Sequence, residues 1–171
     1  MITFKPLTKS DFQRLQKWLN VDFVTNWYQR RKFIYDDVEK LFSGKRYYYV
    51  PVTSFIVEID SVPIGYAQNY RLDDYPYFSS CLDVTESQAG MDVFIGDTLY
   101  LRKGYGAPII SQFVQQVVFK KHGIETCIVG IDPLDLWTIK VYKKAGFTLF
   151  KQTKEYFMML PKSTEKIIFK S

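Results

Sequence analysis

The sequence predicts an α/β (α+β) fold in which helices flank one mixed central β-sheet. The chain has 171 residues, a length that suits one domain. Apolar residues alternate in some stretches, as in strands, and recur every three or four residues in others, as in amphipathic helices. The two kinds of segment are interleaved without repeats or linkers, so we expect them to share one sheet. We predict a single domain over residues 1–171, with a core at about residues 2–160 and a polar tail at residues 161–171.

The N-terminal part predicts one strand and two helices. Residues 2–7 alternate as in a strand. Ser10-Asp11-Phe12-Gln13 has the spacing of a capping box, and the apolar residues Phe12, Leu15, Trp18 and Leu19 follow it with helical spacing. A second short helix is predicted at Tyr35–Phe42, ended by Gly44. Residues 25–32 show no clear periodicity, and residues 47–51 are ambiguous.

The middle of the chain predicts a β-hairpin and a further strand. Residues 54–59 and 64–70 alternate as in strands, and Asp60-Ser61 between them is typical of a turn. A long irregular loop follows, and the next strand is predicted at Gly90–Ile95.

The C-terminal half predicts two helices and three strands. A helix is expected at Ala107–Lys121, where His122 and Gly123 form a structural helix end, and a central strand at Thr126–Ile131. A second helix at Leu136–Lys144 is closed by Gly146, and residues 147–151 and 156–160 predict a closing pair of strands.

A basic, glycine-rich loop joins the strand at residues 91–95 to the helix at residues 107–121. Its sequence is Leu101-Arg102-Lys103-Gly104-Tyr105-Gly106-Ala107, and Pro108 suits the first helical turn, where its missing N–H costs nothing. A strand, a loop without Cβ atoms and a helix N-terminus direct backbone N–H groups towards an anion. No Gly-Lys-Ser/Thr follows, which excludes a Walker loop, and Ile109 at the third glycine position disfavours a dinucleotide fingerprint. An ordinary strand-to-helix turn or a different kind of pyrophosphate site remains.

Three stretches together resemble a known family. The loop is similar to the Q/R-x-x-G-x-G/A acetyl-CoA loop of the GNAT acetyltransferase superfamily, although Leu101 stands where Gln or Arg is usual. Residues 63–68 (PIGYAQ) and 90–96 (GMDVFIG) resemble the aminoglycoside 6′-N-acetyltransferases. Asp132-Pro133 and residues 141–147 (VYKKAGF) resemble the helix that ends the acetyl-CoA site. The resemblance, which covers residues 2–160, implies the GNAT fold with a splayed strand at the acetyl-CoA site.

The resemblance also implies which residues bind acetyl-CoA. Phe94 and Ile95 lie where the splayed strand pairs its backbone with the pantetheine arm. Asp135 stands where the family commonly has an Asn near the cofactor, and so brings a negative charge towards a polyanion. The expected cofactor-binding residues are Phe94, Ile95, Leu101, Arg102, Lys103, Gly104, Tyr105, Gly106, Ala107 and Asp135.

An acidic stretch precedes the basic loop. Residues 72–101 contain no Lys or Arg and carry Asp73, Asp74, Asp83, Glu86, Asp92 and Asp97, with Tyr75, Tyr77 and Phe78 among them. Carboxylates hold ammonium groups and aromatic faces cover the apolar side of a sugar ring, so the stretch suits an amino sugar. A solvated acidic loop is the alternative. With Tyr66 from the family motif, the expected substrate-binding residues are Tyr66, Asp73, Asp74, Asp83, Glu86 and Asp92.

Two residues are the candidates for the chemistry of acetyl transfer to an amine. Asp92 matches the acid of the Gly-Met/Ile-Asp motif, as general base or ammonium anchor; a buried structural Asp is the alternative. Tyr142 matches the tyrosine that protonates the coenzyme A thiolate in the superfamily, but it also fits the apolar face of its helix with Ile139. We expect direct transfer in a ternary complex, because neither cysteine lies in the motifs.

Composition limits the other functions. The net charge is +5, but no basic stripe with interleaved aromatics indicates nucleic-acid binding. Cys81 and Cys127 lack metal-ligand spacing and predict no disulfide framework, so we expect no metal. No leader or long apolar run appears, which favours a soluble, cytoplasmic protein without a membrane partner, as a monomer or homodimer. A GNAT enzyme for another amine (a siderophore precursor, a polyamine or a protein amino group) and a non-catalytic acetyl-CoA-binding module are the competing interpretations.

Overall fold

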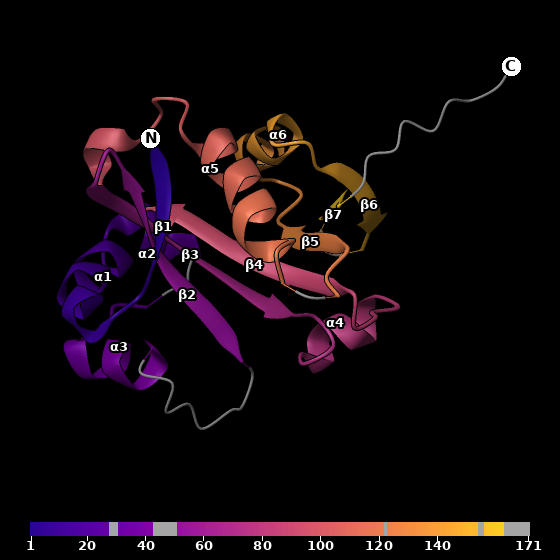
Figure 1. Ribbon diagram of the computed structural model, residues 1–171, viewed down its shortest axis with the longest axis horizontal. Coiled ribbons are helices and arrows are strands. Elements are labelled where there is room, and N and C mark those ends of the chain that lie inside the picture. The colour runs from indigo at the N-terminus through magenta and orange to yellow at the C-terminus, as the bar shows by residue number, and fades with distance from the viewer. Residues whose placement is uncertain (28–30, 43–50, 122, 154–155, 163–171) are drawn as a thin grey trace, which may run out of the picture.

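The computed structural model describes residues 1–27, 31–42, 51–121, 123–153 and 156–162. A seven-stranded sheet in the order β1-β2-β3-β4-β5-β7-β6 forms its centre (Figure 1). The strands are β1 (Ile2–Pro6), β2 (Val52–Ile59), β3 (Val62–Arg71), β4 (Gln88–Ile95), β5 (Thr126–Ile131), β6 (Thr148–Gln152) and β7 (Tyr156–Pro161). The helices are α1 (Phe12–Leu19), α2 (Asp22–Trp27), α3 (Tyr35–Phe42), α4 (Pro76–Cys81), α5 (Gly106–Phe113) and α6 (Leu136–Lys144). The mixed sheet with flanking helices confirms the predicted fold class.

The two faces of the sheet are covered by different helices. On one face, α5 and α6 pack over a cluster that includes Met91, Ile109, Phe113, Val129 and Tyr142 (Figure 1). On the other face, α1 and α3 cover a second cluster around Tyr66 and Phe94, and α4 covers a third around Leu72 and Phe157. Side chains alternate along a strand, so β4 contributes Met91, Val93 and Ile95 to the first face and Asp92 and Phe94 to the second.

Strands β4 and β5 separate after a short region of parallel pairing. Gln88, Ala89 and Gly90 pair with Thr126, Cys127 and Ile128, whereas β4 stays paired with β3 as far as Ile95. Among the described residues, no pairing joins the rest of β4 to β5. The two strands are therefore paired only at the beginning of each, which matches the splay expected from the family resemblance.

Several predicted elements are correct to the residue. The helices Tyr35–Phe42 and Leu136–Lys144 and the strand Thr126–Ile131 have the expected bounds. The hairpin turn at Asp60-Ser61 is also confirmed, with both residues at positive φ. Gly44, His122, most of residues 47–51 and most of the C-terminal tail lie outside the described residues.

Four local predictions need correction. The capping box is formed by Thr8 and Asp11, not by Ser10 and Gln13, because the 3₁₀ turn η1 (Lys9–Asp11) precedes α1. Helix α2 lies partly within the stretch that showed no periodicity, and α4 lies within the loop predicted to be irregular. The helix predicted at Ala107–Lys121 consists of α5 and a π-helical segment, η3 (Val114–Val118), in which Phe119 N–H donates to the Val114 carbonyl at 2.9 Å.

No helix among the described residues is both long enough and apolar enough to cross a bilayer.

Candidate active site

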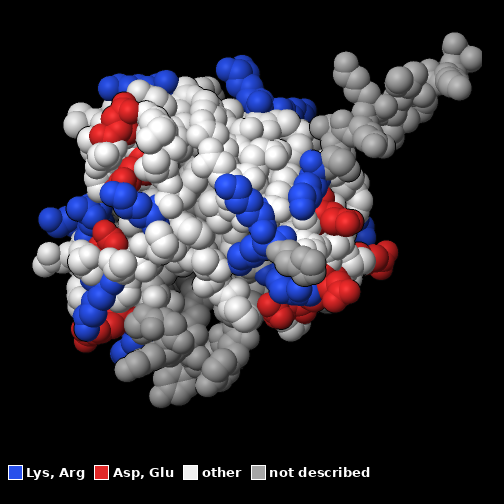
Figure 2. Space-filling model, viewed as in Figure 1, with Lys and Arg blue, Asp and Glu red and all other residues white. Residues whose placement is uncertain are grey.

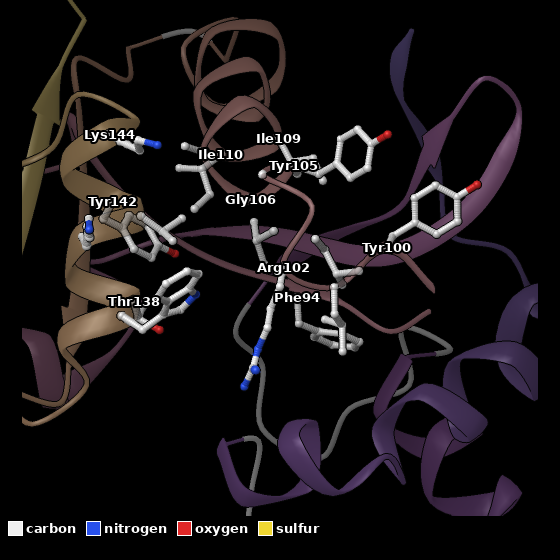
Figure 3. A pocket seen from close by; sticks show the side chains of 18 of the residues that line it. Phe94, Tyr100, Arg102, Tyr105, Gly106, Ile109, Ile110, Thr138, Tyr142 and Lys144 are labelled. Atoms are coloured by element: carbon white, nitrogen blue, oxygen red, sulfur yellow. The ribbon is translucent and has the colours of Figure 1, made fainter. Parts of the chain in front are cut away.

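A cavity of about 840 Å³ opens where β4 ends, between α5 and α6. Its walls are the end of β4, the glycine loop, the first turns of α5 and one side of α6, with Tyr142 and Arg102 on different sides (Figure 3). The expected cofactor-binding residues Phe94, Ile95, Leu101, Arg102, Gly104, Tyr105, Gly106 and Ala107 line it, as do Thr98, Tyr100, Ile109 and Ile110. The structure thus brings most of the predicted cofactor set to one cavity.

The two glycines of the loop serve different purposes. Gly104 has φ +86°, a conformation that L side chains rarely adopt, and a Cβ there would meet no atom within 4 Å. Gly106 begins α5, and its Cβ would lie 3.1 Å from Val141 Cγ1 on α6. Gly104 therefore permits the turn and leaves its surroundings open, whereas Gly106 permits close packing of α5 against α6.

Backbone donors and cations converge on this loop. Within the described chain, the N–H groups of Lys103, Gly104 and Gly106 donate to no other protein group; the first bond in this region runs from Ile109 N–H to the Tyr105 carbonyl at 3.0 Å. Arg102, Lys140 and Lys144 line the cavity, and none of its described lining residues is Asp or Glu. Unpaired donors at a helix N-terminus, with cations beside them, suit an anionic ligand.

Lys103 and Asp135 belong to the expected cofactor set but not to the cavity lining. The Lys103 ammonium lies 6.0 Å from the centroid of the Tyr100 ring, on the loop beside the cavity. Asp135 is the N-cap of α6, and its Oδ1 accepts a hydrogen bond from Thr138 N–H at 2.9 Å. Its carboxylate thus stabilises the first turn of the helix that carries the cavity-lining residues Trp137 and Thr138.

Tyr142 is a buried phenol in the wall of the cavity. It lies on α6 and packs edge-on against Phe147, with ring centroids 5.1 Å apart. Burial, and next the Asp92 carboxylate, raises the pKa of Tyr142 well above its ordinary value, so the phenol stays protonated at neutral pH. The arrangement provides a proton donor at the cavity surface.

Asp92 lies on the opposite face of β4. Gln68 is its cross-strand partner on β3, and Gln68 Nε2 donates a hydrogen bond to Asp92 Oδ2. Asp92 does not line the cavity, but its neighbours Val93 and Phe94 do. Its carboxylate is near enough to raise the pKa values of Tyr142 and of Tyr70, a second buried phenol whose shift is mainly due to burial. A carboxylate and a phenol therefore face the same region from two sides of β4.

The acidic stretch lies apart from the cavity, mostly around α4. Asp73, Asp74, Asp83 and Glu86 do not line the cavity, and acidic side chains gather at the α4 edge of the molecule (Figure 2). Asp73 forms a two-point ion pair with Arg71, at 2.7 and 3.1 Å, which lowers the pKa of its carboxyl. Arg71 immediately precedes the stretch that lacks cations, so part of the acidic charge is compensated.

The aromatic residues of this stretch pack on Tyr70. The Tyr70 ring centroid lies 4.6 Å from that of Tyr75 and 6.2 Å from that of Phe78. The Tyr70 ring in turn lies against Gly90, where a Cβ would come within 2.3 Å of the ring. These contacts hold the acidic stretch against the strand that carries Asp92. The remaining acid, Asp97, caps the 3₁₀ turn η2 (Thr98–Tyr100) by accepting from Leu99 N–H at 2.9 Å.

Tyr66 was expected to bind substrate, but its side chain is completely buried. Its hydroxyl contacts Ser54 Oγ at 2.8 Å and donates to Gln68 Oε1 at 2.7 Å. In this conformation Tyr66 is therefore behind Asp92 rather than on a surface that substrate touches.

Several residues of the cavity were missed at the level of sequence. Phe23 and Trp137 line it with 40% and 65% of their surface exposed, although they lie on α2 and α6, far apart in sequence. No local pattern distinguishes such exposed aromatics. Lys140 and Lys144 were detectable, because a spacing of four residues places two cations on one face of the predicted helix.

Comparisons with known proteins find acetyltransferases similar to this chain. A family model described as an acetyltransferase (GNAT) domain matches residues 8–154. Aminoglycoside N(6′)-acetyltransferases type 1 from Klebsiella pneumoniae and Serratia marcescens are each 24% identical over 148 residues, covering 85% of this chain and 73% of theirs.

Solved structures share the fold. AAC(6′)-Ib with paromomycin and acetyl-CoA has a TM-score of 0.82 and 22% identity, over 94% of this chain and 93% of that one. AAC(6′)-Ib with coenzyme A and kanamycin has a TM-score of 0.80 and 23% identity, over 94% and 95%. The family model matches residues 8–154, which is most of the chain, and the solved structures share its fold: the chain belongs to the GNAT acetyltransferase family.

Proposed function

We propose that this protein transfers the acetyl group of acetyl-CoA directly to a primary amine of an aminoglycoside, the 6′-amino group. The observation that carries the proposal is the cavity, where a glycine turn with unpaired N–H groups, three cations and a protonated Tyr142 meet beside Asp92. The names of the curated relatives and the ligands of the structural neighbours support it.

The cofactor half of the site suits a long polyanionic thioester. The backbone of Gly104 and Gly106, with Arg102, would hold the phosphates, and Lys140 and Lys144 add charge on the α6 side. The backbone of Phe94 and Ile95, in the part of β4 that follows its short pairing with β5, would bind the amides of the pantetheine arm. Asp135 contributes by capping α6, and Lys103 as a screened charge outside the cavity. When bound, acetyl-CoA supplies the activated acetyl group.

The chain provides a group for each proton that the reaction moves. An ammonium must lose a proton before it can attack a carbonyl, and the Asp92 carboxylate would accept that proton, directly or through water, or would anchor the ammonium. Tyr142 keeps its proton at neutral pH, so it would supply one where the sulfur departs. A backbone N–H in the part of β4 that follows its pairing with β5 would stabilise the negative charge that develops on the carbonyl oxygen.

We propose that the acidic stretch binds the amine substrate that accepts the acetyl group. Asp83 and Glu86 are exposed and Asp74 is half-buried, all near α4 on the Asp92 face of the sheet. These carboxylates would attract the other ammonium groups of a polycationic sugar, and Asp73 would contribute less because Arg71 already binds it. Tyr66 would act only indirectly, because its side chain is buried.

A thiol-release assay tests the proposal. Purified protein with acetyl-CoA and kanamycin or tobramycin should release free thiol, and expression should raise the drug concentration that bacteria tolerate. Activity on spermidine, hydroxylamine-type siderophore precursors or peptide amines, with none on aminoglycosides, would favour a GNAT enzyme for another amine. Saturable acetyl-CoA binding without turnover on any amine would favour the non-catalytic module. The cytoplasmic location and the monomer or homodimer state stay predictions.

A further inference from the structure

Four polar side chains form a continuous hydrogen-bonded chain across β2, β3 and β4, behind the proposed active site. Ser54 Oγ contacts the Tyr66 hydroxyl at 2.8 Å, the Tyr66 hydroxyl donates to Gln68 Oε1 at 2.7 Å, and Gln68 Nε2 donates to Asp92 Oδ2. The strand register requires this neighbourhood, because Ser54 is opposite Gln68 and Gln68 is opposite Asp92. The chain therefore follows from the pairing of three strands rather than from a chance contact of loops.

The hydrogen-bonded chain of side chains has a fixed donor-to-acceptor direction. A tyrosine hydroxyl has one proton, and Tyr66 gives that proton to Gln68, so Ser54 must be the donor in its contact with Tyr66. Gln68 receives at its oxygen and therefore presents its NH₂ group to Asp92. If the amide rotated by 180°, its oxygen would face the carboxylate and its NH₂ group would face the Tyr66 proton. An ionised carboxylate only accepts hydrogen bonds, so Asp92 requires the NH₂ group of Gln68, and the Tyr66 hydroxyl supplies the donor that supports this orientation at the amide oxygen.

The hydrogen-bonded chain of side chains is also buried and closely packed. Tyr66 is 0% and Gln68 5% exposed, so solvent does not compete for their hydrogen bonds. The Tyr66 ring packs against Phe94 and Phe42, with both pairs of ring centroids 5.5 Å apart. Phe94 lines the cavity, so the ring that orients the amide is in contact with the cavity wall.

We infer that Tyr66 and Gln68, supported by Ser54, are positioning residues that fix one oxygen of the Asp92 carboxylate so that it meets the substrate amine in a single orientation. This inference rests on the proposed function. The competing explanation is that the chain merely satisfies buried polar groups, which would otherwise destabilise the fold. The two explanations differ in what happens when the chain is altered without disturbing the packing.

Gln68→Glu is the sharpest alteration, because it keeps shape and replaces the donated hydrogen bond by a second carboxylate. Two neighbouring carboxylates repel each other and the donated hydrogen bond is lost, but repulsion favours uptake of one shared proton as the pH falls, which restores a donor between them. At neutral pH, kcat should fall roughly 10- to 100-fold, the scale typical of losing a supporting partner of a functional group. The ratio of variant to wild-type kcat should rise as pH falls from 8 to 6. A ratio that is constant with pH would overturn the inference, as would a wild-type rate.

Tyr66→Phe keeps the ring and removes only the hydroxyl. It should lower kcat roughly 2- to 10-fold, the equivalent of one neutral hydrogen bond, and leave KM for acetyl-CoA unchanged. Tyr35→Phe is the matched control, since Tyr35 packs on the same cluster outside the chain. Gln152→Glu, on the exposed strand β6, controls for the added charge. Equal kcat values for Tyr66→Phe and Tyr35→Phe would contradict the inference.

A measurement that does not depend on turnover separates this inference from the proposed function. The Gln68 side-chain NH₂ resonances in a ¹⁵N-labelled sample should shift in Tyr66→Phe and in Asp92→Asn but not in Tyr35→Phe. If the wild-type protein acetylates no amine, the proposed function fails, while these shifts still decide whether Tyr66 orients the amide towards Asp92. Unchanged Gln68 resonances in Tyr66→Phe would refute the positioning role.

Discussion

Asp92 on β4 and Tyr142 on α6 approach from opposite faces of the sheet, and the Asp92 carboxylate contributes to the raised pKa of the Tyr142 phenol. The approach is possible because β4 leaves β5 after Gly90, which opens the sheet at this point. The carboxylate that we propose as proton acceptor and the phenol that we propose as proton donor therefore lie on the two sides of the splay.

Tyr142→Phe tests the proton-supplying side. The variant keeps the ring packed against Phe147 and removes the hydroxyl, so the fold should be preserved. If Tyr142 is the general acid, turnover should fall roughly 10²- to 10⁴-fold with little change in KM for the amine. Steady-state thiol release measures this loss. A rate close to that of the wild type would leave Tyr142 as a packing residue of α6.

Asp92→Asn tests the amine side. The amide is isosteric but cannot take a proton, so loss of a general base should lower kcat/KM roughly 10²- to 10⁴-fold. If the carboxylate only anchors the ammonium group, Asp92→Asn should mainly raise KM for the amine. The contact between the two charges would then form when the amine binds and contribute equally before and during the chemical step. Measuring kcat and KM separately distinguishes the two roles. If neither parameter changes, the base must be sought among Asp73, Asp74, Asp83 and Glu86.

Gly104→Ala tests the anion-binding turn. Gly104 has φ +86°, so a Cβ strains the backbone by about 1 kcal/mol or more and projects into the open space where phosphate would approach. The strain should lower stability, whereas the obstruction should raise the Kd for acetyl-CoA at least about 5-fold, equivalent to about 1 kcal/mol of binding free energy, in isothermal titration.

Gly123→Ala is the control for this experiment. Gly123 also has positive φ, +78°, and a Cβ added there would meet no atom within 4 Å, but it does not line the cavity. The two variants should lose similar stability, and only Gly104→Ala should lose affinity. Equal affinities would show that the turn does not contact the phosphates.

The sequence predicts the helices and strands around this site better than the contacts of its side chains. The strand Thr126–Ile131 and the helix Leu136–Lys144 have clear periodicity and clear ends, and their bounds are correct. Helix α4 was missed because its six residues, between loops of acidic and aromatic residues, are too few for a helical period to appear. The capping box was misplaced because Ser10 and Thr8 offer equally plausible spacings, and only the 3₁₀ turn before α1 decides between them.

Site residues depend on contacts between distant segments, which a local pattern does not contain. The glycine loop was detectable because its chemistry is contiguous in sequence. Tyr66 was assigned to the substrate from its motif, whereas the strand register buries it and turns its hydroxyl towards Gln68. Likewise Asp73 was expected to bind substrate, whereas Arg71, at the end of β3, forms an ion pair with its carboxylate. In both cases the missing information was the partner across or along the sheet.

Alkaline pH should destabilise the fold through three buried acids. Burial raises the pKa values of Cys127, Tyr70 and Tyr142 above their ordinary values, so the folded protein keeps protons that the unfolded chain loses. Stability from each group is complete below its unfolded-state pKa and is lost as pH rises above it. Each contributes a slope of about 1.4 kcal/mol per pH unit, so we expect the decline to begin near pH 9 with Cys127 and to steepen above about pH 10 with the tyrosines.

Urea unfolding between pH 7 and 11 measures this decline. Cys127→Ala should be less stable at every pH, because it leaves a cavity, but its decline should begin only above about pH 10, where the tyrosines of the unfolded chain ionise. Cys81→Ala, at the partly exposed cysteine, should retain the wild-type onset. If the unfolding free energy of the wild-type protein were constant up to pH 10.5, the Cys127 thiol would have to be hydrated in the folded state, and its complete burial would be wrong.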